Sequence, residues 1–102
     1  MPYYIYEYTL SEKGLLNIKD IPTVINQHYK GVEAIGGKKV ETYYVFGKNS
    51  FVSIVEFPDD ETAEIWNLGS PEDPTNALWE PGFTVKKAFT LEEFTNIVKK
   101  LT

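Results

Sequence analysis

Large apolar side chains at both odd and even positions of three short segments restrict the fold of this chain more than any other feature. Aromatic and β-branched residues favour strands, and successive side chains of a strand point to opposite faces of its sheet. In the first segment, Tyr4, Tyr6 and Tyr8 therefore lie on one face, and Tyr3 and Ile5 lie on the other. The three segments, each with apolar residues on both faces, are 2–9, 39–46 and 51–57. We expect a sheet with two apolar faces.

A helix is predicted between the first two strands, because apolar residues recur there at alternating spacings of four and three. Gly36 and Gly37 end it, since glycine accepts the left-handed conformation that closes a helix. The predicted buried row, with one polar member, is Ile21, Ile25, His28, Val32 and Ile35.

Two more helices and a fourth strand follow. Acidic residues at 59–61 suit the N-terminus of a second helix, and 83–89 reads as a strand. Thr90 and Glu93 have the spacing of a capping box that opens a last helix. Its predicted inner side carries Phe94, Ile97, Val98 and Leu101. The loop-like stretch 69–81 is interrupted by a turn at 73–79, and we expect it to form the rim of any pocket, with Trp79 as its anchor.

The predicted order is βαββαβ with a C-terminal helix, which is typical of a single ferredoxin-like α+β domain over residues 1–102. Such a domain has a four-stranded antiparallel sheet with two helices on one face. The second apolar face is then a larger exposed patch than soluble proteins usually carry. We therefore expect a homodimer formed through a sheet face; the alternative is a sheet whose tyrosines simply tolerate water.

Composition excludes several classes of function. The chain has no cysteine and one histidine, so disulfides, thiolate sites and a multi-histidine metal cage are ruled out. We expect neither a metal nor a cofactor. The net charge of −5 disfavours binding to nucleic acid. The sequence shows no apolar run long enough for a membrane span and no signal segment, so we expect a cytoplasmic protein that does not bind membranes.

Four segments resemble the GYD domain family, which belongs to the dimeric α/β-barrel group of ferredoxin-like proteins. They are Gly14-Leu-Leu-Asn-Ile-Lys-Asp-Ile-Pro22, Glu33-Ala-Ile-Gly-Gly-Lys38, Val52-Ser-Ile-Val-Glu-Phe-Pro-Asp-Asp-Glu61 and Lys87-Ala-Phe-Thr-Leu-Glu-Glu-Phe94. The resemblance implies a dimeric α/β barrel. The Gly-x-Tyr-Asp of the family name falls on Gly47-Lys-Asn-Ser50, where only the glycine remains. The wider group includes cofactor-free monooxygenases, isomerases, haem-binding proteins and ligand sensors, so the resemblance implies no single activity.

His28 is the candidate catalytic residue, because an imidazole on an apolar helix face can act as an acid or base near neutral pH. A carboxylate among Glu7, Glu41 and Glu56 would raise its pKa and complete an acid/base pair. The alternative is a core histidine bonded to a neighbour. Aromatic residues around it form a candidate pocket, or else core and dimer interface. The candidate ligand-binding residues are His28, Tyr29, Tyr44, Trp66 and Trp79, with Tyr43 and Phe83 as further aromatic candidates.

Two functions from different classes follow. The first is a small homodimeric protein that binds a small, partly apolar ligand or serves as an accessory domain. The second is a cofactor-free monooxygenase or isomerase that acts on an aromatic or enolisable substrate, with His28 as the base and a Tyr hydroxyl or Trp N–H that orients the substrate. A purely structural assembly module remains as a third alternative if no cavity exists. A His28 that faces a cavity with polar neighbours favours the enzyme.

Overall fold

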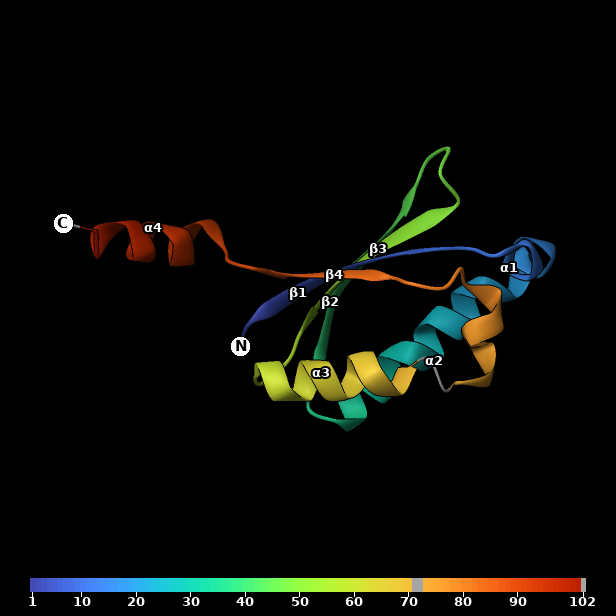
Figure 1. Ribbon diagram of the computed structural model, residues 1–102, viewed down its shortest axis with the longest axis horizontal. Coiled ribbons are helices and arrows are strands. Elements are labelled where there is room, and N and C mark those ends of the chain that lie inside the picture. Colours follow the sequence, from blue (N-terminus) through green and yellow to red (C-terminus); the bar gives the residue numbers. More distant parts are fainter. Residues whose placement is uncertain (71–72, 102) are drawn as a thin grey trace.

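The protein is described by a computed structural model of residues 1–70 and 73–101 (Figure 1). Four strands and their helices occur in the predicted order, with 3₁₀ helices labelled η. The elements are β1 (Tyr3–Thr9), α1 (Glu12–Leu16), η1 (Ile18–Asp20), α2 (Ile21–Ala34), β2 (Lys38–Val45), β3 (Ser50–Glu56), α3 (Asp60–Gly69), η3 (Pro74–Leu78), β4 (Thr84–Ala88) and α4 (Leu91–Lys99). The prediction of an α+β fold is confirmed.

The sheet is four-stranded and antiparallel, in the order β2-β3-β1-β4. Residues directly opposite each other in an antiparallel pair share a face. Tyr4 faces Val55 on β3 and Lys87 on β4, so these three lie on one face. Ile5 lies opposite Ile54 on the other face. The predicted separation of Tyr4, Tyr6 and Tyr8 from Tyr3 and Ile5 is therefore confirmed.

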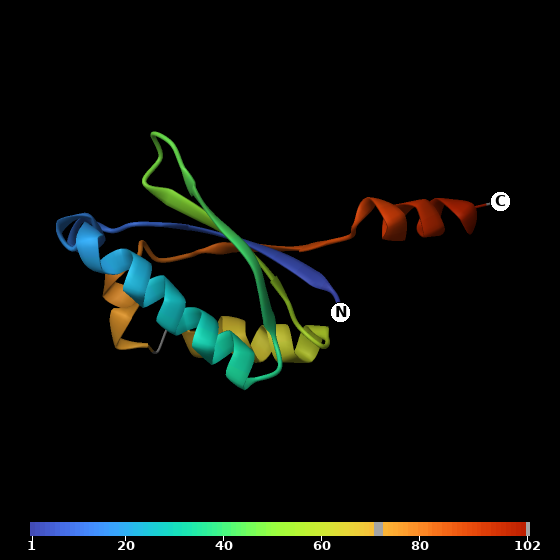
Figure 2. The same ribbon diagram turned by 180° about the vertical axis from the view of Figure 1, so that it is seen from behind.

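Helices α2 and α3 lie on the same side of the sheet in both views and cover one face, which we call the inner face (Figures 1 and 2). The most deeply buried large side chains are Phe57, just beyond β3, and Ile21, which opens α2, at 0% and 1% exposure. The core between these layers consists of Tyr4, Tyr6, Leu10, Ile21, Val24, Ile25, Tyr29, Val32, Val55, Phe57, Ala63 and Trp79. The pocket of the protein lies against this inner face.

The predicted row on α2 is corrected at one end. Ile21, Ile25 and Val32 are buried, whereas Ile35 is 37% exposed. Ile35 is the C-cap of the helix, and Gly36 follows with a φ of 93°. The chain therefore turns away from the core before Ile35 can point into it.

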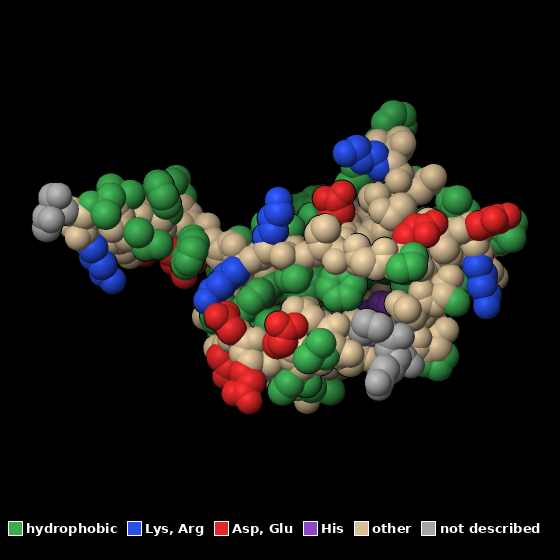
Figure 3. Space-filling view, viewed as in Figure 1, with side chains coloured by type: hydrophobic (Ala, Val, Ile, Leu, Met, Phe, Trp, Pro, Cys, Tyr) green, Lys and Arg blue, Asp and Glu red, His purple; other side chains and the backbone are tan. Residues whose placement is uncertain are grey.

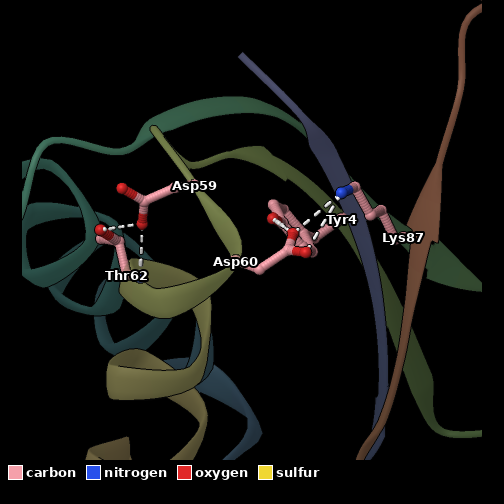
Figure 4. Close-up of polar contacts among 5 residues, drawn as sticks. All are labelled: Tyr4, Asp59, Asp60, Thr62 and Lys87. Carbon is pink, nitrogen blue, oxygen red and sulfur yellow. Dashed lines mark hydrogen bonds and ion pairs between the residues drawn. The ribbon is translucent and has the colours of Figure 1, made fainter.

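The N-terminus of α3 is tied to the sheet (Figure 4). The carboxylate of Asp59 caps the helix by accepting from the backbone N–H of Thr62 at 2.8 Å. The Tyr4 hydroxyl donates to the Asp60 carboxylate, and Lys87 Nζ lies 3.0 Å from the same group. These two partners hold the pKa of Asp60 below its usual range, while burial and the adjacent carboxylate raise the pKa of Tyr4 to about 12.

The opposite face of the sheet carries the second apolar set, and no helix in residues 1–70 or 73–101 covers it. We call this the outer face. Tyr43 is 57% exposed there. Its apolar members are Tyr3, Ile5, Tyr43, Val45, Val52, Ile54 and Ala88, and the register places Glu7, Lys38, Glu41, Glu56 and Lys86 among them.

The C-terminal helix α4 differs from the prediction. Its capping box is present, but no residue within the helix is buried, and Phe94, Ile97 and Val98 are 55%, 40% and 43% exposed. The connection from β4 is only residues 89–90, and the helix continues away from the sheet instead of folding back onto it (Figure 2). The radius of gyration is consequently 15.0 Å, against about 13 Å for a compact domain of this length.

Candidate functional site

A pocket of about 320 Å³ lies between the inner face and the helices. The sheet supplies its floor, α2 one wall and α3 another, while Ser70, Thr75, Asn76 and residues 79–83 form the rim. Figure 3 shows hydrophobic side chains in the hollow between β4 and α3, with the histidine beside it. The lining residues are Tyr6, Tyr8, Ile25, His28, Tyr29, Val32, Ser53, Val55, Trp66, Ser70, Thr75, Asn76, Trp79, Glu80, Pro81, Gly82 and Phe83.

Trp79 fixes the rim to the body of the protein. It is 8% exposed and meets the Tyr8 ring edge-on, with 4.9 Å between ring centroids. It also forms an isolated β-bridge with Leu10, and the next backbone N–H, that of Glu80, donates to the carbonyl of Thr9 at 2.7 Å. The prediction that Trp79 anchors a pocket rim is therefore confirmed for the described residues; the part of the predicted rim at 71–72 lies outside them.

The Trp79 indole Nε1–H is buried and has no hydrogen-bond partner among residues 1–70 and 73–101. Its ring meets Tyr8 and Phe51 at nearly right angles, 85° and 88°. Edge-to-face packing of this kind places the positive edge of one ring toward the face of another. The aromatic cluster thus gives the indole an electrostatically favourable environment without a conventional acceptor.

His28 projects from α2 toward the rim and completes a polar chain. The Asp73 carboxylate accepts from both the backbone N–H and the hydroxyl of Thr75, at 2.8 and 2.7 Å. The Thr75 hydroxyl has a single proton and gives it to Asp73, so its oxygen must accept from His28 Nε2, 2.9 Å away. In neutral His28, the proton therefore resides on Nε2 and the free lone pair on Nδ1.

Burial lowers the pKa of His28, and the nearby charge of Asp73 opposes this only in part. The imidazole is therefore neutral at neutral pH, as a general base must be. The carboxylate beside it differs from the one expected. Glu7, Glu41 and Glu56 belong to the outer face, because each lies opposite outward-facing residues in the strand register. The sheet separates them from His28, and Asp73 of the rim takes their place.

A second polar group lies on the pocket floor. The Tyr8 hydroxyl and Ser53 Oγ are 2.5 Å apart, and Ser53 Oγ is 3.1 Å from Thr42 Oγ1. Burial raises the pKa of Tyr8 to about 12, so its hydroxyl stays protonated. Sequence reasoning assigned Tyr8 to a sheet face and did not single out Ser53. The available signal was a serine at an inward-facing position between apolar neighbours.

The pocket brings together four of the five predicted ligand-binding residues, His28, Tyr29, Trp66 and Trp79, and adds Phe83. Tyr44 does not line it. Its side chain is 52% exposed and packs against Phe51 near the hairpin end, and its hydroxyl reaches Asn49 at 3.4 Å. Tyr43 also lies outside, on the outer face. Tyr43 and Tyr44 are adjacent in β2, so their side chains point to opposite faces of the sheet and cannot both reach the pocket. Tyr44 is on the inner face but lies too close to the hairpin end of β2 to reach it.

Within residues 1–70 and 73–101, no group of three or more histidine or acidic side chains is arranged to hold a metal ion. In the same residues, no helix combines the length and apolarity needed to cross a bilayer.

The fold and the pocket define a ferredoxin-like α+β protein with an aromatic cavity between sheet and helices. The model of the GYD domain matches residues 4–70, and the chain belongs to this family. The match ends before the rim that holds Thr75 and Trp79. No curated protein matches the chain.

Two crystal structures of the protein Atu4242 from Agrobacterium tumefaciens have a similar fold. The chain superposes on them with TM-scores of 0.58 and 0.59 at 18% identity. Each alignment covers 89% of this chain, and 96% and 90% of the respective Atu4242 chain. One of the two is described as a NIPSNAP family protein with unknown function. At this identity, the likeness supports the fold alone.

Proposed function

We propose that this protein binds a small, partly apolar molecule in the pocket between its sheet and its helices. The observation that carries the proposal is the pocket of about 320 Å³ with aromatic walls and few polar groups. Pockets for small molecules have this composition and enclose roughly 300–1,000 Å³. The volume of this pocket lies at the low end of that range. Trp66, Tyr6 and Phe83 offer ring surfaces to a flat apolar portion of the ligand. The His28 edge offers a polar contact that fixes orientation.

The two tryptophans of the chain provide the test, because both line the pocket. Their indole N–H signals are two separate reporters in a nitrogen-15 correlation spectrum. Titration with a set of small aromatic compounds that carry a hydroxyl donor should shift both signals for at least one compound. Trp66→Phe should remove one signal and keep most of the binding, whereas Val55→Phe should fill the cavity and abolish the shifts. Compounds that bind without moving either indole signal would place the binding site elsewhere.

We further propose that the protein is a homodimer, joined through its outer face in the manner of a dimeric α/β barrel. Tyr3, Ile5, Tyr43, Val52 and Ile54 form an apolar surface that the described residues leave uncovered. A standard interface of about 800 Å² per partner would remove it from water.

Neighbouring positions on β3 test the dimer with matched variants. Ile54→Lys introduces a charge on the outer face and should give a folded monomer. Val55→Lys introduces the same charge into the core, where Val55 is 3% exposed, and should unfold the chain. Sedimentation equilibrium and circular dichroism separate the two outcomes. A wild-type protein that stays monomeric at all concentrations would contradict the homodimer.

A second candidate function is proton abstraction from an enolisable or aromatic substrate, as in a cofactor-free monooxygenase or isomerase. The specific observation in its favour is that His28 lines the pocket with Thr75 and Asp73 as polar company. Asp73 and Thr75 act as positioning residues that keep Nδ1 unprotonated. Under this proposal, His28→Gln retains ligand binding at the indole reporters but loses turnover by 10²-fold or more, an order-of-magnitude value typical of acid–base residues. Equal turnover in the two proteins would exclude His28 as the base.

A further inference from the structure

Helix α4 is well formed locally yet unsupported by the rest of the chain. The Thr90 hydroxyl accepts from the Glu93 N–H at 3.1 Å, and the Glu93 carboxylate accepts from the Thr90 N–H at 2.8 Å. The helix has nine residues, none of them buried. An isolated helix of that length is marginal in water, because most helical stability in proteins comes from packing of an apolar face. Something outside the described chain must therefore support it.

The helix carries an apolar row with the spacing of a packing surface. Phe94, Ile97, Val98 and Leu101 follow the i, i+3, i+4, i+7 pattern, which places them on one side. Leu101, just beyond the helix, is 73% exposed, and Leu91 in its first turn is 80% exposed. Figure 3 shows hydrophobic side chains along the projecting helix.

This row begins beside one end of the outer face. Ala88 lies opposite Tyr3 in the sheet register, and the exposed Phe89 connects it to the first turn of α4. Glu93 is close enough to Tyr3 to contribute, after Glu56, to raising the pKa of that hydroxyl. The apolar row of α4 thus begins close to Tyr3, at the end of the outer face.

We propose that α4 reaches across to a second copy of this chain and packs its apolar row against the body of that copy. The proposal rests on the homodimer through the outer face. Phe89, Leu91, Phe94, Ile97, Val98 and Leu101 each expose on the order of 100 Å², which supplies most of the roughly 800 Å² that one partner contributes to a stable dimer. A two-fold axis lets each copy support the helix of the other.

Other occupants fit less well. The inner face is already covered by α2 and α3, and the short connection from β4 directs α4 away from its own sheet. A lipid surface would require an excess of basic residues on the polar side. Here Glu92 and Glu93 balance Lys99 and Lys100.

Matched variants of the full chain test the helix separately from the sheet. Phe94→Asp with Ile97→Asp should raise the dimer dissociation constant by about 100-fold or more, since two large apolar side chains lose their burial. Asn96→Asp with Lys100→Gln makes the same change in net charge on the other side of the helix. It should leave the dimer dissociation constant within about threefold of the wild-type value. Equal dissociation constants for the two double variants would overturn the proposal.

Two further measurements show independently whether α4 is packed and against which chain it packs. Amide hydrogen exchange in residues 94–101 should be slow in the dimer and fast in the Ile54→Lys monomer. Equal protection in both would show that α4 packs on its own chain. A photo-crosslinking benzoylphenylalanine at position 94 should join two chains. A crosslink within one chain would overturn the proposal that α4 packs on the second copy. If wild type is monomeric throughout, the homodimer itself fails; if it is dimeric with unprotected α4 amides, only the helix proposal fails.

Discussion

Replacing His28 by leucine separates a histidine that serves the pocket from one that serves only the core. The variant loses one hydrogen bond, from Nε2 to Thr75, worth about 1 kcal/mol. Thr75 still donates to Asp73, so no buried hydroxyl proton is left without a partner. Leucine gains apolar burial that offsets the loss by roughly 1–2 kcal/mol. The free energy of unfolding at pH 8 should therefore stay within about 1 kcal/mol of wild type.

The difference between the proteins should grow in acid. Burial lowers the pKa of His28 in the folded state, so below its ordinary value of 6.5 the unfolded chain takes up a proton that the folded chain resists. The stability associated with neutral His28 is complete above pH 6.5 and is lost as the pH falls through the lowered folded-state pKa. The loss is at most about 1.4 kcal/mol per pH unit for one proton. The leucine variant has no imidazole and therefore lacks this pH-dependent loss of stability.

Urea unfolding of both proteins at pH 8.0, 6.0 and 5.0 measures this directly, and the shared carboxylates cancel in the comparison. The stability of the leucine variant relative to wild type should rise as the pH falls. In the variant, the indole signals of the two tryptophans should also lose their response to ligands that donate a hydrogen bond to Nδ1. A variant destabilised by more than about 2 kcal/mol at pH 8 would show that the hydrogen bond to Thr75 is structural. Parallel pH profiles would show that His28 is not shielded from water.

Two further substitutions examine the rim. Trp79→Ala should lower the free energy of unfolding by about 3–5 kcal/mol, as expected for a buried aromatic residue; a loss below about 1 kcal/mol in urea unfolding would show that the ring is not an anchor. Gly14→Ala would place a Cβ 2.1 Å from the carbonyl oxygen of Leu78. It should displace η3, shift both indole signals and destabilise the protein by about 1–3 kcal/mol, whereas Gly69→Ala, which meets no atom within 4 Å, should leave both signals in place.

The strands and the main helices could be predicted because local signals determine them. Alternating aromatic residues set both faces of β1, and the Thr90–Glu93 capping box opens α4 where expected. Long-range packing was not accessible in the same way. The apolar row of α4 indicates that the helix buries that side, but not against which chain, so its position away from the body could not be foreseen.

The site was partly predictable for the same reason. His28 and Trp79 stood out as a lone imidazole on an apolar face and an aromatic residue in a proline-rich loop. The partner carboxylate was expected from the sheet, yet strand parity places Glu7, Glu41 and Glu56 on the outer face. Asp73 is linked to His28 through Thr75, and this link depends on the packing of the rim against α2, a tertiary contact that no local pattern encodes.

Native mass spectrometry of the purified wild-type protein tests the central claim most directly, since it reads stoichiometry and bound small molecules in one spectrum. We expect a dimer at micromolar concentration that takes up one added aromatic ligand with a hydroxyl donor per chain, and the cavity-filling Val55→Phe variant should abolish this uptake. A monomer that takes up no ligand, or equal uptake by the wild type and the filled variant, would contradict it.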